Sequence, residues 1–185
     1  AVENAVGGAA LPPYETRETL ARLESDLDKT ASKVVICLGD SFDAPGIDAV
    51  LPDDEVLRIA RLQAGRDWHW IEGNHDPGPV AIGGVHRAEF TLGPLTFRHI
   101  AVPQARGEIS GHYHPKARII ARGRTLSRPC FLLDETRLIL PAYGAYTGGL
   151  RSDSAVLSSL MRPDARAILT GPRPAAIPLP RLHRA

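Results

Sequence analysis

Apolar residues recur at intervals of three or four positions in the first part of the chain, with charged residues between them. The clearest set is Leu20, Leu23 and Leu27. This spacing places the apolar side chains on one face of a helix, for which Thr16 is the expected N-cap. A second helix is predicted over 53–64, capped by Asp53 and ended by Gly65, because glycine readily adopts the left-handed conformation that closes many helices.

Continuous apolar runs predict strands. The runs at 33–38 and 68–71 are expected as strands of the first half, each followed closely by a glycine. The second half is strand-rich and begins with a hairpin that turns at Gly93-Pro94. The strands predicted there are 89–92, 95–98, 118–121, 130–133, 138–140 and 167–170. This order of elements predicts an α/β fold in which two mixed β-sheets form a sandwich flanked by helices.

The two ends of the chain differ from its interior. Residues 1–10 are mostly small, and we expect them to be flexible. Residues 171–185 hold four prolines, and we expect them to form an extended strap on the surface. With 185 residues, the whole chain 1–185 is long enough for a single domain with its own hydrophobic core.

The composition is that of a globular protein, because 43% of the residues are hydrophobic and 23% are charged. No apolar run comes near the roughly 20 residues of a membrane span, and the first residues lack the regions typical of a signal peptide. Cys37 and Cys130 lie in apolar runs, which favours buried thiols over a disulfide and indicates the cytoplasm. With a net charge of +1, any nucleic-acid-binding face must be local.

Side chains that can bind a divalent metal follow several of the predicted strands. They are Asp40, Asn74, His99, His112 and His114. Loops at strand ends are where open active sites are usually built, and two histidines separated by one residue lie on one face of an extended chain. Taken singly, each motif has an ordinary structural explanation, but their order along the chain does not. His69 lies between two tryptophans, and we expect it to be packed within its strand and not to be a ligand.

The order of these motifs resembles that of the calcineurin-like metallophosphoesterase superfamily. The closer resemblance is to a bacterial branch, the ligase-associated DNA-damage-response endonucleases, and it covers nearly the whole chain from Leu11 onward. The segments that carry it are LPPYETRETLARL (11–23), CLGDSF (37–42), IEGNHDPG (71–78), LTFRHIA (95–101), EISGHYHPKAR (108–118) and RPCFLLDETRLILPAYGAYTGGL (128–150).

The resemblance implies a centre of two divalent metal ions. Asp40 would bridge the two metals, and His114 would bind the first. The ligands of the second metal would be completed by Asn74, His99 and His112. Oxygen and nitrogen ligands without a thiolate favour Mn²⁺, with Fe or Zn as alternatives. Two adjacent cations lower the pKa of a bridging water and hold the phosphate oxygens in line for displacement.

The resemblance also implies roles for the two residues after Asn74. His75 would lie beside the substrate phosphate, where it can stabilise developing charge or protonate the leaving oxygen. Asp76 would either orient His75 or cap the following turn, and the sequence does not favour one role over the other.

Two positions depart from the family pattern. The Asp-x-His motif that opens this pattern and supplies the first metal is absent before Gly39. In the branch it precedes the LPPY segment, so it lies upstream of Ala1 or has been lost, and the first site keeps only Asp40 and His114. Asp43 stands where the branch commonly has histidine. It still matches the superfamily's looser Gly-Asp-x-x-Asp pattern, which leaves open a role in supporting the metal ligands.

A run of basic residues follows the last motif. It consists of Lys116, Arg118, Arg122, Arg124 and Arg128. Such a run can follow a phosphate backbone, or it can be a solvated strand face. Lys116 and Arg118 are nearest to His114 and are the candidates for contacts with a substrate phosphate.

Three functions are compatible with these observations. The resemblance implies a Mn²⁺-dependent DNA endonuclease of DNA repair in the bacterial cytoplasm, acting on single-stranded or damaged DNA in functional association with a DNA ligase and a helicase. A phosphoesterase for small nucleotides would need a closed pocket in place of an open basic groove. A non-catalytic metal- or nucleic-acid-binding protein is expected if the Asp-x-His motif is absent from the gene.

Overall fold

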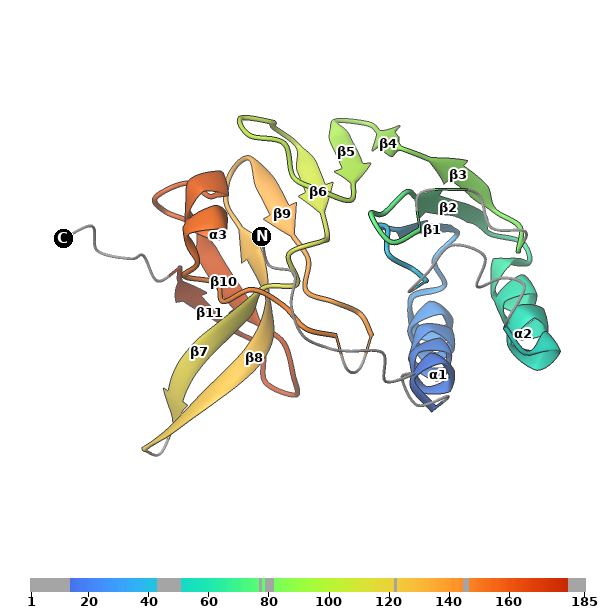
Figure 1. Ribbon diagram of the computed structural model, residues 1–185, viewed down its shortest axis with the longest axis horizontal. Helices are drawn as coiled ribbons and strands as arrows, with labels where there is room; N and C mark the ends of the chain where they lie inside the picture. Colours follow the sequence, from blue (N-terminus) through green and yellow to red (C-terminus); the bar gives the residue numbers. More distant parts are fainter. Residues whose placement is uncertain are drawn as a thin grey trace.

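The computed structural model describes residues 14–42, 51–76, 78, 82–121, 123–144 and 147–179. Asp43 and the 1–10 segment lie outside these described residues, as does the end of the tail from residue 180. The described chain forms two β-sheets with helices outside them (Figure 1), which confirms the predicted α/β sandwich. Among the described residues, no helix combines the length and the apolar content that crossing a bilayer requires.

The smaller sheet is parallel and has the order β1-β2-β3 in the described chain. Its strands are β1 (Val34–Cys37), β2 (Asp67–Ile71) and β3 (Val85–Arg87). The helices α1 (Tyr14–Thr30) and α2 (Asp53–Gln63) pack their leucines and isoleucine against Trp68 and Trp70 of β2. Because parallel strands run in the same direction, β1 and β2 end at the same edge of the sheet. Asp40 and Asn74 follow these two ends.

Both helices begin differently from the predictions made from capping residues. The first, α1, starts at Tyr14, so Thr16 lies inside the helix and is not its N-cap. The N-cap of α2 is Pro52 without a side-chain cap bond, and Asp53 is the first helical residue. Asp53 is favourable there because a negative charge in the first turn stabilises the helix dipole. Gly65 follows the end of α2 with a φ of 70°, as expected.

The larger sheet is mixed and, in the described chain, has the order β11-β10-β8-β9-β6-β5-β4, with β7 paired to β8. Its strands are β4 (Glu89–Leu92), β5 (Leu95–Arg98), β6 (Glu108–Ser110), β7 (Lys116–Ala121), β8 (Arg124–Leu133), β9 (Arg137–Ile139), β10 (Arg166–Leu169) and β11 (Ala175–Pro178). The predicted hairpin at Gly93-Pro94 is β4–β5. Part of the proline-rich tail is extended, as expected, and pairs with β10 as β11.

The hairpin β7–β8 projects beyond the larger sheet (Figure 1). The prediction of a strand only at 130–133 was too short, because β8 begins at Arg124. Its first residues, 124–129, pair with β7, whereas 130–133 pair with β10 and the last two of these also with β9. The polar residues of 124–128 have no core face to mark them as a strand in the sequence.

The core of the larger sheet lies between the sheet and α3 (Ala155–Leu160), a helix that the sequence analysis missed. Leu157 of α3 and Cys130 of β8 are both fully buried there. Both cysteines are free, as expected. Burial raises the pKa of the Cys130 thiol to about 11 and that of Cys37 to about 12, so neither is a thiolate at neutral pH.

Candidate metal centre

The residues expected to bind metal lie on loops where strand ends of the two sheets meet. Asp40 and Asn74 follow β1 and β2 of the smaller sheet. His99 follows β5 of the larger sheet, and His112 follows β6, its parallel neighbour. The backbone N–H of Gly111 donates to the carbonyl of His99 at 3.0 Å, which joins the last two loops. Each sheet therefore contributes two of the four side chains.

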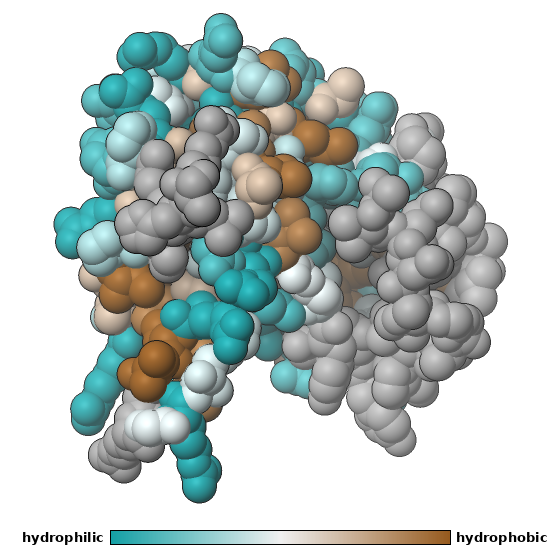
Figure 2. All heavy atoms as spheres, turned by 60° about the vertical axis from the view of Figure 1, so that its left-hand side comes forward, coloured by the Kyte–Doolittle hydropathy of each residue, from teal (hydrophilic) through white to brown (hydrophobic). Residues whose placement is uncertain are grey.

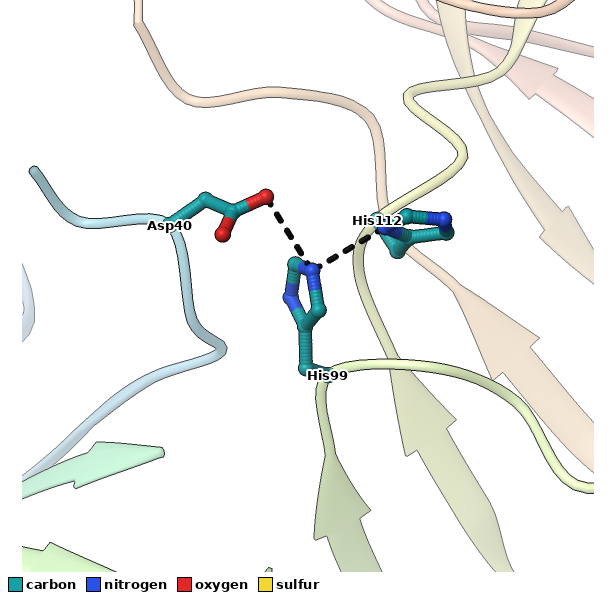
Figure 3. Close-up of side chains that lie close together, drawn as sticks. All are labelled: Asp40, His99 and His112. Atoms are coloured by element: carbon teal, nitrogen blue, oxygen red, sulfur yellow. Dashed lines mark hydrogen bonds and ion pairs between the residues drawn. The ribbon is translucent and has the colours of Figure 1, made fainter. Parts of the chain in front are cut away.

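The four side chains converge on the Nε2 atom of His99. This atom lies 3.0 Å from Oδ1 of Asn74 and 3.1 Å from Oδ2 of Asp40. The Nδ1 atom of His112 lies 3.0 Å from the same point (Figure 3). Ligand atoms of Asp40, His99 and His112 all lie within 4.8 Å of one another. This spacing is that of side chains around one small cation, since metal–ligand bonds are about 2 Å long.

The hydrogen bonds of His99 favour a metal at this position. Its Nδ1 lies 2.7 Å from the carbonyl oxygen of Leu38, and a carbonyl can only accept, so Nδ1 carries a proton. In the neutral ring, Nε2 then has a lone pair that faces the oxygens of Asp40 and Asn74, which also only accept, and the Nδ1 of His112, which donates or accepts according to its tautomer. A cation at this point would bind the lone pairs of Nε2 and of both oxygens. A ring N–H donated to a backbone carbonyl is also the usual arrangement behind a metal-bound histidine.

The backbone at the site adopts conformations that most residues avoid. Among the described non-glycine residues with positive φ are Asp40, His112 and His114, with φ values of 49°, 59° and 46°. Left-handed backbone at such residues is uncommon and is concentrated at functional sites. Gly39 also has a positive φ, and a Cβ there would lie 2.5 Å from Nδ1 of His99. The close approach of the His99 ring to β1 therefore requires glycine.

Asp76 fastens together the two loops of the smaller sheet. Its carboxylate accepts hydrogen bonds from the backbone N–H groups of Asp40, Ser41, Phe42 and Gly73. In addition, the N–H of His75 donates to Oδ1 of Asp40 at 2.8 Å. The bonds of Asp76 thus hold the loop of Asp40 against Gly73.

A buried cluster of charges holds the loop that follows His99. Glu108 is 1% exposed and Arg137 is 4% exposed. The Glu108 carboxylate accepts from the N–H of Val102 at 2.9 Å and lies 3.1 Å from Nη1 of Arg137. The Arg137 guanidinium donates to the carbonyls of Val102 and Ala105. Sequence reasoning missed this pair, although a glutamate in the short strand before Gly-His-x-His was a usable signal.

The same charges also reach the residue before His99. Nε of Arg98 lies 3.5 Å from the Glu108 carboxylate, and Nη2 of Arg98 lies 3.1 Å from Glu89 on β4. Charged side chains therefore hold the chain on both sides of His99.

The other histidines of the predicted site lie at its margin. His114 is not part of the group formed by Asp40, His99 and His112. Burial lowers the pKa of His114 and of His112, which favours the neutral rings that bind metals. The side chain of His75 is exposed, and its electrostatic influence reaches His112.

The remaining candidates are placed as follows. The Lys116 ammonium donates to the carbonyl of Thr147 at 2.9 Å, and Arg118 is exposed on β7. His69 is 2% exposed and its ring stacks on Phe90, which confirms that it is packed in its strand. Asp43 is among the residues outside the described part of the chain.

A solved structure resembles the fold of this chain. Nuclease MPE from Pseudomonas putida superposes on the chain with a TM-score of 0.64 and is 30% identical to it. The similarity covers 88% of this chain and 79% of the nuclease. The chain belongs to the family of that nuclease. No protein-family model matches the chain, and no curated protein matches it.

Membership in this nuclease family agrees with the geometry of the site. Asp40, His99 and His112 form a group that fits a divalent metal. The loops that carry them come from both sheets, so the site depends on the whole fold.

Proposed function

We propose that the protein is a divalent-metal-dependent phosphodiesterase that cleaves DNA as an endonuclease. The observation that carries this proposal is the convergence of Asp40, Asn74 and His112 on a His99 ring whose other nitrogen is committed to a carbonyl. The family relationship to a nuclease supports a nucleic-acid substrate.

The residues would hold metal in a defined way. The four converging side chains would bind one divalent ion, with Mn²⁺ the expected metal and Fe or Zn the alternatives. Asp40 would also face a second ion, to which His114 would contribute. Metal ions in such a centre lower the pKa of bound water and neutralise charge on the phosphate.

The protein's own groups would do the rest of the chemistry. His75 is exposed beside the ligands and can protonate the leaving oxygen of the phosphodiester through a ring nitrogen. Asp76 would act through the backbone by holding Asp40 and Gly73 in register. Lys116 and Arg118 would contact phosphates of the substrate, since Lys116 uses one N–H on Thr147 and retains others.

The biological setting follows from the resemblance found in the sequence. We propose single-stranded or damaged DNA as the substrate, action in DNA repair in the cytoplasm of a bacterium, and functional association with a DNA ligase and a helicase. Each of these remains a proposal that rests on the segments from 11–23 to 128–150.

The proposed function is tested by metal titration and cleavage together. Calorimetric titration of the 185-residue chain with Mn²⁺ should show one firm site, at the four converging side chains, and a second that is weak or absent. His99→Ala should abolish the firm site and the Mn²⁺-dependent cleavage of a single-stranded oligonucleotide. The matched control His86→Ala removes a histidine outside the site and should retain both.

One result would contradict the ligand assignment, and another would contradict the proposed function. Two firm sites of similar affinity would mean that a residue outside our ligand set replaces the missing motif. Equal cleavage with and without EDTA, or by His99→Ala, would exclude a metal-dependent mechanism at this site.

A further inference from the structure

The charged residues of the β7–β8 hairpin are all basic. No acidic residue occurs between Glu108 and Asp134, whereas five basic ones do. The whole chain has a net charge of only +1, so this segment is set apart from the rest. Among the described residues, none of its lysine or arginine side chains forms an ion pair closer than 4 Å, in contrast to Arg58 or Arg98. Lys116 donates to the carbonyl of Thr147 and Arg128 donates to that of Thr170, but a carbonyl does not neutralise either positive charge.

The packing of the hairpin changes along its length. At its root, Ala117 and Cys130 are fully buried in the core of the larger sheet. Towards its tip, Ile120 is 82% exposed and Leu126 is 39% exposed. Figure 2 shows hydrophilic side chains projecting at the lower end of the molecule, with hydrophobic atoms directly above them. A two-stranded hairpin with few core contacts is only marginally stable in water, so its extension into solvent indicates a role other than stabilising the fold.

A pocket of about 350 Å³ lies where the hairpin leaves the core. Its lining combines two guanidinium groups with apolar side chains. It is lined by Ile119, Arg128, Leu169, Pro172, Arg173 and Ala175. Ile119 pairs with Leu126, and Ala117 pairs with Arg128, so the pocket lies on the face of the hairpin that also carries Leu126. A pocket of this size with apolar walls and two charged groups suits an amphipathic anion.

We infer that this pocket binds one nucleotide of a single-stranded nucleic acid whose scissile phosphate lies at the metal centre. This inference rests on the proposed function and adds a second, remote contact with the same strand. Arg128 and Arg173 would hold the phosphate, and the base and sugar would lie against Ile119, Leu169 and Pro172. An unpaired base is needed, because a stacked duplex does not present its base faces to a protein.

The chain length from His114 limits how far the pocket can lie from that residue. Ile119 is five residues beyond His114, so the two residues are at most about 16 Å apart at 3.3 Å of extended chain per residue. That length corresponds to about five nucleotides at the 3.4 Å rise of a stacked strand. Binding through the pocket should thus distinguish a polymer from a mononucleotide.

The test measures binding without cleavage. The affinity of fluorescein-labelled oligothymidine of 20 nucleotides is measured by anisotropy in EDTA, for the full chain and for the Arg128→Gln/Arg173→Gln variant. Kd should rise about tenfold or more, and the slope of log K against log salt should fall by about 1.4, which is 0.7 for each lost phosphate contact on a single strand. Arg173→Gln alone lies at an exposed position and should show half of the change in slope.

A matched control separates a local site from net charge. The Lys33→Gln/Arg61→Gln variant also removes two positive charges, from exposed positions on the side of the smaller sheet, and should bind like the unmodified chain. An equal loss in both double variants, or no loss in either, would overturn the inference. Competition by dTMP or inorganic phosphate as effective as that by the oligonucleotide would also overturn it, because the pocket would then be a site for a small anion.

The outcome can be told apart from failure of the proposed function. Loss of strand binding in EDTA by Arg128→Gln/Arg173→Gln supports the pocket even if the chain proves unable to cleave. Mn²⁺-dependent cleavage together with unchanged strand binding in that variant rejects the pocket and leaves the proposed function intact.

Discussion

On the side of the smaller sheet, the loops of Asp40 and Asn74 are held together by backbone N–H groups that donate to Asp76. On the side of the larger sheet, charged side chains buried around Glu108 hold the chain before and after His99. The first arrangement needs one carboxylate and a partly exposed loop. The second needs opposite charges removed from water. Ligands of one centre are thus positioned by supports that differ greatly in their sensitivity to substitution.

The largest expected effect is on the buried charges. Arg137→Met should destabilise the protein by about 3–5 kcal/mol, because Glu108 then remains buried without its closest partner. The double variant Glu108→Leu/Arg137→Met removes both charges and should recover at least half of the loss. Urea denaturation with the metal removed measures both.

An exposed ion pair serves as the control for this prediction. Arg162→Met breaks the pair with Glu135, whose side chains are both about half exposed, and should change stability by no more than about 1 kcal/mol. If Arg137→Met has as small an effect, the buried cluster does not support the His99 loop and the contrast between the two halves disappears.

The next largest effect concerns catalysis on the smaller-sheet side. His75→Ala should lower the cleavage rate about 10²-fold, equivalent to about 2.7 kcal/mol, which is the scale expected for a positioned acid. Stability and Mn²⁺ affinity should not change, because the side chain is exposed and its backbone N–H still donates to Asp40. Single-turnover kinetics with calorimetry on the same variant check both parts. Near-normal cleavage would reject the role of His75.

A smaller effect is expected for the support of the Asp40 loop. Asp76→Asn keeps one acceptor oxygen and replaces the other with an amide that cannot accept, so stability should fall by about 1–3 kcal/mol. Mn²⁺ affinity should fall as well, since the position of Asp40 depends on these bonds. The matched control is Asp134→Asn, because Asp134 also accepts backbone N–H groups, from Thr136, Arg137 and Arg162.

The control makes this prediction specific to the metal site. Asp134→Asn should cause a similar loss of stability by thermal unfolding but no change in Mn²⁺ affinity by calorimetry. A comparable loss of affinity in both variants would show that general destabilisation, and not the position of Asp40, controls metal binding.

The sequence predicted the fold class and the meeting of four of the site residues because these features depend on local patterns. The spacing of apolar residues predicts a helix, as it does at Leu20 and Leu27, which pack against β2. Polar residues directly after strands, such as Asp40 and Asn74, lie at a common edge if the strands are parallel. These inferences need no knowledge of contacts between distant segments.

Features that depend on distant contacts were missed. Asp76 accepts hydrogen bonds from backbone N–H groups 34–36 positions earlier in the chain. The types of residues in a sequence do not show where such N–H groups lie in space. Glu108 and Arg137 become partners only because β6 and β9 pair. Strands of three residues, such as β3, are too short to show a period. The capping prediction for Thr16 failed because α1 already includes Tyr14, and that for Asp53 failed because Pro52 occupies the cap position of α2.

The smallest expected effect tests whether the two halves are independent. Asp76 and Glu108 share no hydrogen-bond partner among the described residues. In EDTA, the destabilisations caused by Asp76→Asn and Glu108→Gln should therefore add to within about 0.5 kcal/mol in the double variant. A larger interaction energy would mean that the supports of the two sheets are coupled through the protein itself.

Saturating metal should create the coupling that is absent without it. A bound ion present at 100 times its Kd adds about 2.7 kcal/mol of stability, and any variant that weakens the site loses part of this contribution. Where calorimetry shows that each substitution alone abolishes Mn²⁺ binding, the double variant loses this contribution only once, so in Mn²⁺ its total destabilisation should be smaller than the sum of the two single values. The difference between the summed single values and the value of the double variant should approach the free energy by which Mn²⁺ stabilises the unmodified chain. Calorimetry and thermal unfolding of the unmodified chain measure that free energy. For such variants, additivity in Mn²⁺ would mean that one ion does not join Asp40 of the smaller sheet to His99 of the larger one, because a single bound ion can be lost only once.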